Sequence, residues 1–329
     1  MTEDASLARW STRWAEHLPI LSLDDQERLL AEADATITAL QRAAGLSGKR
    51  ALHAACPYAT EDAELRIRAD LPAALYHGLL QPGARYPAIL RYSSASSKLQ
   101  NEQAADQRGL AVRVLGSDGQ RQDLLHTSSS EAHHARNAEA MLVSLRAAAA
   151  GMGPFGKLGA LWTLAWGLGP SEALRIAKTL PTWADQGRSL ASLSYFSRTP
   201  FRVGPYAIKT RLVPPEGVRP DAQELGADVA ARRAAGDVVY RWEAHGFTTP
   251  EETPLDDHRI PWGSPWVPLG ELVLPQRTAP ESAEMAARVE AMSFGTHVRW
   301  DADSFQPLGD LNLIRAAYAT SQRNSGRSP

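Results

Sequence analysis

Two blocks of short strand-like segments constrain the fold of this 329-residue chain more than any other feature. The first block, residues 49–137, contains the runs "AELRIRADL", "RYPAILRYSSA", "RGLAVRVLG" and "RQDLLHT", which are separated by turn residues such as "QPG" and "GSDGQ". The second block, residues 194–300, contains "YAIKTRLVPP", "DVVYRWEAHGF" and "GELVLPQ". Short runs of mixed apolar and polar residues with turn residues between them are typical of antiparallel strands in a sandwich or a barrel.

Helical patterns precede, separate and follow these blocks. In residues 5–45, "SLDDQERLLAEADATITALQRAA" has charges in its first turn and apolar residues three or four apart, and "GLSG" ends the pattern. Near the end of the chain, "LNLIRAAYATSQR" has no Gly or Pro inside it, whereas "HVRWDADSFQPLGD" before it has the pattern of a loop. We therefore predict a single α+β domain in which a helical insertion splits an antiparallel β-barrel. Its expected parts are a helical arm (1–48), two barrel halves (49–137 and 194–300), the insertion (138–190) and a C-terminal helical region (301–323).

Charge and cysteine content restrict the functional classes. The 35 basic and 37 acidic residues nearly balance, so the chain lacks the basic surface of a nucleic-acid-binding protein. Cys56 is the only cysteine, which excludes an internal disulfide and fits a reducing compartment. The charged N-terminus has no apolar signal core, so we expect a cytoplasmic protein.

The most apolar segment, "LGALWTLAWGLG" at residues 158–169, is too short to span a bilayer, which needs about 20 apolar residues. We expect it to be a buried helix. Two other roles stay open, namely one wall of an apolar substrate entrance and a shallow contact with a membrane surface. The final residues, "NSGRSP", have the composition of a loose tail.

Four motifs carry the candidate chemistry. "KRALHA" places Arg50 three residues before His53. An arginine binds carboxylates through a planar fork, and a histidine is the side chain best suited to moving protons near neutral pH. In "ILRYSSAS", Arg91 and Ser93 are two residues apart and would share one face of a strand.

The other two motifs are "DQRGLAVRV", residues 106–114, and "NLIRAAYATSQR", in which Arg315 and Tyr318 share a helix face. Each motif alone has an ordinary structural explanation. Arg50 and Arg91 would be surface charges, and Tyr318 a core aromatic residue. The order and spacing of all four together carry the functional argument.

Together, these motifs resemble those of the catalase family, whose members bind haem. The resemblance covers roughly residues 49–137 and 194–323, and "SYFSRTPFRVGPYAIKTRL" looks like a strand pair of the shorter bacterial members. It implies a catalase-type barrel, haem b as the iron-containing cofactor, and an R-x-x-H element on the first barrel strand. It also implies roles for individual residues: the distal catalytic histidine (His53), its hydrogen-bond partner (Ser93), the arginines that bind the haem propionates (Arg50, Arg91, Arg323), and the tyrosine that ligates iron (Tyr318).

Two of the departures from the family pattern concern candidate site residues. Arg315 precedes Tyr318 by three residues instead of four, and we keep it as the partner of the tyrosine because both spacings put the two on one helix face. An ungapped match puts Ser128 where catalases carry a distal asparagine, with Thr127 as an alternative donor of a polar group. We therefore expect weak dismutation of hydrogen peroxide.

His133 and His134, with Glu131 and His126 nearby, raise the question of a metal site. Their spacing is not diagnostic, because adjacent histidines do not readily share one ion, and we expect a solvated polar edge instead.

The resemblance implies a haem-dependent peroxidase that acts on organic or hydrogen peroxides with an unknown reductant. Two rivals stay open: a haem-dependent hydroperoxide isomerase, dehydratase or biosynthetic oxidase, and a non-catalytic haem-binding protein. We expect a homo-oligomer, either a dimer or a tetramer, with no nucleic-acid partner and no transmembrane segment.

Overall fold

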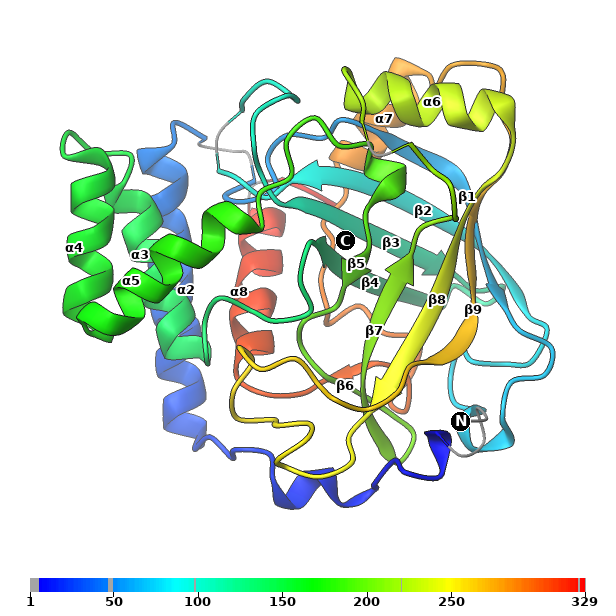
Figure 1. Ribbon diagram of the computed structural model, residues 1–329, viewed down its shortest axis with the longest axis horizontal. Helices are drawn as coiled ribbons and strands as arrows, with labels where there is room; N and C mark the ends of the chain where they lie inside the picture. Colours follow the sequence, from blue (N-terminus) through cyan, green and yellow to red (C-terminus); the bar gives the residue numbers. More distant parts are fainter. Residues whose placement is uncertain (1–5, 47–49, 98, 220, 325, 329) are drawn as a thin grey trace.

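The computed structural model describes residues 6–46, 50–97, 99–219, 221–324 and 326–328, and a closed antiparallel β-barrel forms its centre (Figure 1). Eight strands form the ring in the order β7-β5-β4-β3-β2-β1-β9-β8, and β8 pairs with β7 to close it. Two short strands, β10 and β6, extend the sheet from β7. The strands are β1 (Ala59–Ile67), β2 (Arg85–Ser94), β3 (Arg108–Leu115), β4 (Arg121–Ser128), β5 (Tyr195–Phe196), β6 (Phe201–Val203), β7 (Tyr206–Val213), β8 (Val238–Gly246), β9 (Val267–Leu274) and β10 (Gln306–Pro307).

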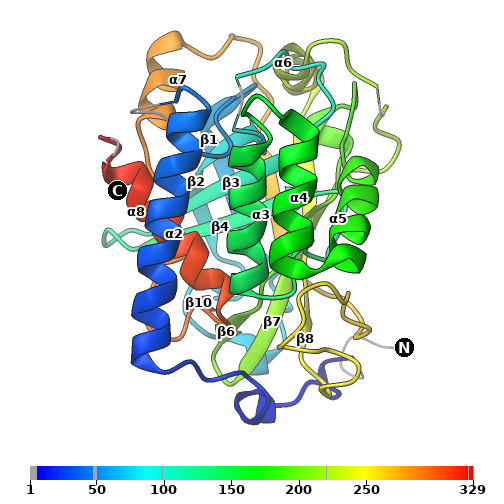
Figure 2. The same cartoon turned by 90° about the vertical axis from the view of Figure 1, so that its left-hand side faces the viewer.

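Helices cover one side of the barrel and one of its ends (Figures 1 and 2). The α-helices are α2 (Leu23–Ala43), α3 (Ala138–Ala150), α4 (Gly156–Leu168), α5 (Pro170–Thr182), α6 (Leu225–Ala235), α7 (Ala283–Glu290) and α8 (Leu311–Asn324). Three short 3₁₀ helices are η1 (Arg13–Glu16), η2 (Ala73–Leu75) and η3 (Leu190–Ser192). This architecture confirms the predicted α+β fold with an antiparallel β-barrel, a helical insertion and a C-terminal helix.

The interior of the barrel is a packed core. Tyr92, Tyr195, Tyr240 and Trp242 are completely buried inside it, and the Tyr92 and Tyr240 hydroxyls lie 2.8 Å apart. Successive side chains on a strand point to opposite faces. The residues next to Tyr92 therefore point outward, to the face of β2, β3 and β4 that the helices cover.

Helix α8 lies between this outer face of the barrel and helices α2 and α3 (Figure 1). Ile314 of α8 packs with Leu29, Ile37 and Leu142 in one apolar cluster that joins the three helices. The neighbouring helices begin at well-defined caps. Ser22 accepts a hydrogen bond from the backbone of Asp25, and Asn137 accepts one from Ala140, as expected of N-cap residues.

Several predictions about local structure are wrong. The expected helix over residues 5–45 begins only at Leu23, and Ser6–Leu21 are mostly irregular apart from η1. The "KRALHA" segment is not on the first barrel strand, because residues 50–58 form a loop and β1 begins at Ala59. Helices α6 and α7 lie in the segment that we expected to be only strands and loops.

The expected burial of the apolar segment 158–169 is also wrong. It forms α4, but Leu164 is its only buried residue, while Trp162 is 71% exposed and Trp166 is 83% exposed. Within the described parts of the chain, no helix combines the length and apolar character needed to cross a membrane.

Candidate active site

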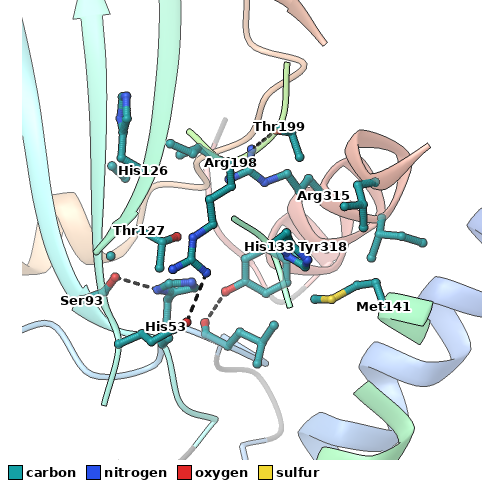
Figure 3. Close-up of a pocket in the computed structure, with 18 of the residues that line it drawn as sticks. His53, Ser93, His126, Thr127, His133, Met141, Arg198, Thr199, Arg315 and Tyr318 are labelled. Carbon is teal, nitrogen blue, oxygen red and sulfur yellow. Dashed lines mark hydrogen bonds between the residues drawn. The ribbon is translucent and has the colours of Figure 1, made fainter. Parts of the chain in front are cut away.

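A cavity of about 330 Å³ lies between the outer face of β2–β4 and helices α3 and α8. Figure 3 shows its polar side chains, which come from both sides. Its apolar lining comes largely from the helices and includes Met141, Leu145, Ala148, Leu180 and Ile314. The polar lining residues are Arg50, His53, Arg91, Ser93, Gln107, His126, Thr127, His133, His134, Ser144, Arg198, Thr199, Arg315, Tyr318 and Gln322.

His53 and Ser93 form a hydrogen-bonded pair on the barrel side of the cavity. Ser93 Oγ lies 2.9 Å from His53 Nδ1, the contact expected from the sequence (Figure 3). His53 adopts a left-handed backbone conformation, with φ of 55°. Gly109 on β3 leaves room for the pair, because a Cβ atom there would lie 2.5 Å from Ser93 Oγ and 2.6 Å from His53 Nδ1. The glycine of the motif "DQRGLAVRV" therefore leaves the space that the His53 ring occupies.

The protonation state of His53 follows from its surroundings. Burial lowers the pKa of His53 to about 3, and the cations of Arg91 and Arg50 add to this effect. The imidazole is therefore neutral at neutral pH. In the tautomer in which Nδ1 donates its hydrogen to Ser93 Oγ, Nε2 is the atom that can accept a proton, and no hydrogen bond to Nε2 occurs among the described residues.

Tyr318 enters the cavity from α8. Its hydroxyl donates a hydrogen bond to the carbonyl oxygen of Leu52. Burial raises the pKa of Tyr318, and the positive charges of Arg50 and Arg91 partly oppose this rise. The phenol is thus neutral in this structure, and two nearby arginines favour the loss of its proton when a Lewis acid takes the oxygen.

Arg50 and Arg91 converge at one edge of the cavity on a residue that the sequence did not identify. Glu290, the last residue of α7, lies 3.2 Å from Arg50 Nε and 2.8 Å from the Arg91 guanidinium. Arg327 reaches the same carboxylate at 3.4 Å. The expected loose tail is therefore wrong at Arg327, and Ser328 is also anchored because its backbone bonds with Ala291 and Ser293.

Arg315 lines the cavity, but its hydrogen bond goes to Thr199 Oγ1 at 2.6 Å and not to Tyr318. Next to it in the cavity is Arg198, a second buried arginine that sequence reasoning missed. Arg198 has φ of 62° and donates to the backbone carbonyls of Ser128 and Ser130 at 2.7 Å and 3.0 Å. Among the described residues, neither Arg198 nor Arg315 forms an ion pair with a carboxylate.

Two candidate residues do not reach the cavity. Ser128 is completely buried on the other face of β4, where it donates to Asp185 at 2.6 Å and accepts from the Arg108 backbone. Thr127 lines the cavity instead, because adjacent strand residues point to opposite faces. Arg323 points away toward His297 and is not among the lining residues.

His133 and His134 are half-buried and line the cavity, so the expected solvated edge is wrong. Their rings stack with centroids 4.4 Å apart, and burial lowers the pKa of His134 to about 3. Glu131 instead lies 3.2 Å from His245 Nε2 and 3.5 Å from Lys209 Nζ. The described residues contain no cluster of His, Cys, Asp and Glu that fits a metal ion.

Comparison with known proteins identifies the fold through three-dimensional structure and not through sequence. No family model and no curated protein sequence matches this chain. A fungal catalase matches with a TM-score of 0.64 at 15% identity, over 84% of this chain and 58% of the catalase. The chain has the catalase fold. Catalase A from Saccharomyces cerevisiae gives a TM-score of 0.62 at 12% identity, covering 84% of this chain and 60% of that one. A bacterial catalase gives 0.57 at 14% identity, covering 84% and 57%.

The chain thus spans less than two thirds of the length of these catalases. Haem is the cofactor that the catalase fold implies, and the cavity residues fit it chemically. Tyr318 offers a phenol oxygen, which is the axial ligand type of catalases, and Arg50 and Arg91 offer guanidinium groups for propionates. Ligation by Tyr318 would require its hydroxyl to release Leu52, and binding of propionates by Arg50 and Arg91 would require Glu290 to move.

Proposed function

We propose that this protein is a haem-dependent peroxidase that prefers organic peroxides to hydrogen peroxide. One observation carries the proposal: His53, held by Ser93, shares a cavity with Tyr318, and Arg50 and Arg91 border that cavity. Haem, when bound, supplies an iron that changes oxidation state and binds oxygen ligands.

The chain's own residues hold the cofactor and move the proton. Tyr318 would ligate the iron through its phenolate oxygen, with Arg315 as the nearby cation on α8. Arg50 and Arg91 would bind the propionates. His53 Nε2 would take the proton of the hydroperoxide and return it to the departing oxygen, which avoids an alkoxide leaving group. Ser93 would keep the imidazole ring oriented for this transfer.

The apolar wall of the cavity supports the preference for organic peroxides. The helices contribute an aliphatic surface made of Met141, Leu145, Ala148 and Leu180. Such a surface would bind the carbon chain of an organic peroxide better than it binds hydrogen peroxide. On the barrel side, Thr127 offers a hydroxyl and Gln107 a side-chain amide. The preference for organic peroxides therefore rests on the aliphatic wall, which has no polar group for hydrogen peroxide.

The test is titration of the purified chain with haemin, followed by steady-state assays in which a reducing dye is supplied as electron donor together with cumene hydroperoxide or hydrogen peroxide. His53→Ala should keep the haem absorption bands but slow peroxide turnover by about 10²–10⁴-fold, the usual contribution of general acid–base catalysis. A loss smaller than about tenfold would assign His53 a structural role. Turnover of a fatty-acid hydroperoxide without any reductant would favour the isomerase reaction instead.

A further inference from the structure

The outer face of α4 and Phe155, the residue before it, expose a large apolar surface that the rest of the described chain does not cover. Phe155 is 78% exposed and Leu158 is 75% exposed, and Trp162 and Trp166 follow at 71% and 83%. The two indole rings stack with centroids 6.2 Å apart. Helix α4 is the outermost helix on its side of the molecule (Figure 1), and none of these four exposed side chains lines the cavity.

The opposite face of α4 already has its partner. Leu164 packs with Ala147 of α3 and with Ala173 and Ile176 of α5. A Cβ atom on Gly167 would lie 2.6 Å from Val143, so α4 approaches α3 as closely as a glycine allows. Loose packing of α4 therefore does not explain the exposed tryptophans, because the inner face of this helix packs closely against α3 and α5.

We propose that the outer surface of α4 and α5 docks on an anionic lipid bilayer. Helix α4 is 13 residues long, so it would lie flat in the interface and not span it. Tryptophan is enriched where lipid meets water, because its ring is apolar and its N–H is polar. Both Trp162 and Trp166 would enter the headgroup region together with Leu158.

The charges on this surface match a negatively charged partner. Lys157 and Lys178 are exposed on α4 and α5. Of the residues in these two helices, all of which are described, Glu172 is the only acidic one, and Arg175 and Arg259 neutralise it. Lysines near an anionic membrane surface strengthen binding, and this contribution weakens as salt is added.

The same charges disfavour a second copy of the chain as the occupant. In a two-fold dimer the same patch meets itself. The interface would then contain both copies of Lys157 and Lys178, and the one carboxylate of these two helices is already paired in each copy. A bilayer containing phosphatidylglycerol provides the negative charge that this patch of a second copy lacks.

The position of this surface also relates it to the cavity. Leu180 of α5 is 37% exposed and lines the cavity as well. Docking through α4 and α5 would bring the apolar side of the cavity toward the lipid. If the proposed function holds, peroxides of membrane lipids are the substrate class that this arrangement serves.

The test is sedimentation of the full chain with vesicles of phosphatidylcholine, either alone or mixed with phosphatidylglycerol. We expect binding to the mixed vesicles that is lost on adding salt, together with a blue shift of tryptophan fluorescence. The double variant Trp162→Glu/Trp166→Glu should weaken binding at least about tenfold, since both rings leave the interface. Lys157→Glu/Lys178→Glu should weaken it on the order of fivefold for each lysine removed.

Ile20→Glu is the matched control, because Ile20 is an apolar residue that is 91% exposed outside α4 and α5. It should bind vesicles like the wild type. Circular dichroism and thermal unfolding of each variant check that the fold is kept. A wild type that binds neither vesicle, or tryptophan variants that bind normally, would overturn the proposal. A dimer in solution that Trp162→Glu dissociates would do so too, by assigning the surface to a second copy. None of these outcomes bears on haem binding, which is measured separately without vesicles.

Discussion

The barrel and the helical wall of the cavity hold their polar groups in different ways. On the barrel, buried arginines have several fixed partners: Arg108 donates to Ser94 and to three backbone carbonyls, and Arg113 forms a two-bond pair with Asp123. On the helical wall, Tyr318 has one hydrogen bond among the described residues, to Leu52, and its ring packs against the apolar cluster that joins α2, α3 and α8. The barrel thus orients His53 and Ser93, while the helical wall is free to exchange that contact for a ligand.

The largest expected difference between the two regions concerns stability. Asp123 is fully buried, so Asp123→Ala leaves the Arg113 guanidinium unpaired and should lower the free energy of unfolding by about 3–5 kcal/mol. The control is Glu139→Ala in the helical layer, which removes the exposed pair with Arg28 and should change nothing measurable. Urea unfolding checks both. Equal losses would show that the barrel wall is no more tightly bonded than the helices.

Acid should destabilise the haem-free chain through the histidines that its interior holds neutral. Burial lowers the pKa of His53, His126 and His258 from 6.5 to about 3. Between these values the unfolded chain binds more protons than the folded chain, so stability falls as the pH drops from 6.5 toward 3 and is constant with respect to these groups above 6.5. Urea unfolding at a series of pH values tests this. A flat profile in the acidic range would mean that the histidines reach water.

A smaller effect concerns Glu290, which holds the two arginines together where propionates would bind. Glu290→Gln removes its charge and should tighten haem binding by about tenfold, which corresponds to about 1.4 kcal/mol. It should also lower the stability of the haem-free chain, because Arg50 and Arg91 lose their shared carboxylate. Titration with haemin, paired with urea unfolding, measures both. Weaker haem binding would show that Glu290 supports the cofactor and does not compete with it.

Much of the fold was predictable because local pattern and burial agree. Each long strand and α8 occur where the alternation of residues or the helical spacing indicated them. The exposure of α4 was not predictable, since an apolar run shows that a helix avoids water but not which faces find a protein partner. The loop at His53 was missed because a resemblance does not reveal backbone conformation.

The contact between His53 and Ser93 was predictable because the resemblance pairs the two motifs that contain them. The prediction that Ser128 faces the cavity was wrong, and Thr127, the residue before it, lines the cavity instead. A sequence match alone does not show which face of a strand points outward. Glu290 and Arg198 were missed because only the tertiary fold brings them to the cavity.

The account depends most on Tyr318 as the ligand of haem iron. The direct measurement is the absorption spectrum of the chain during titration with haemin, for the wild type and for Tyr318→Phe. Tyr206→Phe, at a tyrosine outside the cavity lining, is the matched control and should bind haem normally. The account predicts one haem per chain in the wild type, with a ferric spectrum typical of a tyrosinate ligand, and loss of that spectrum in Tyr318→Phe. A Tyr318→Phe variant with an unchanged spectrum and haem content would contradict the central claim.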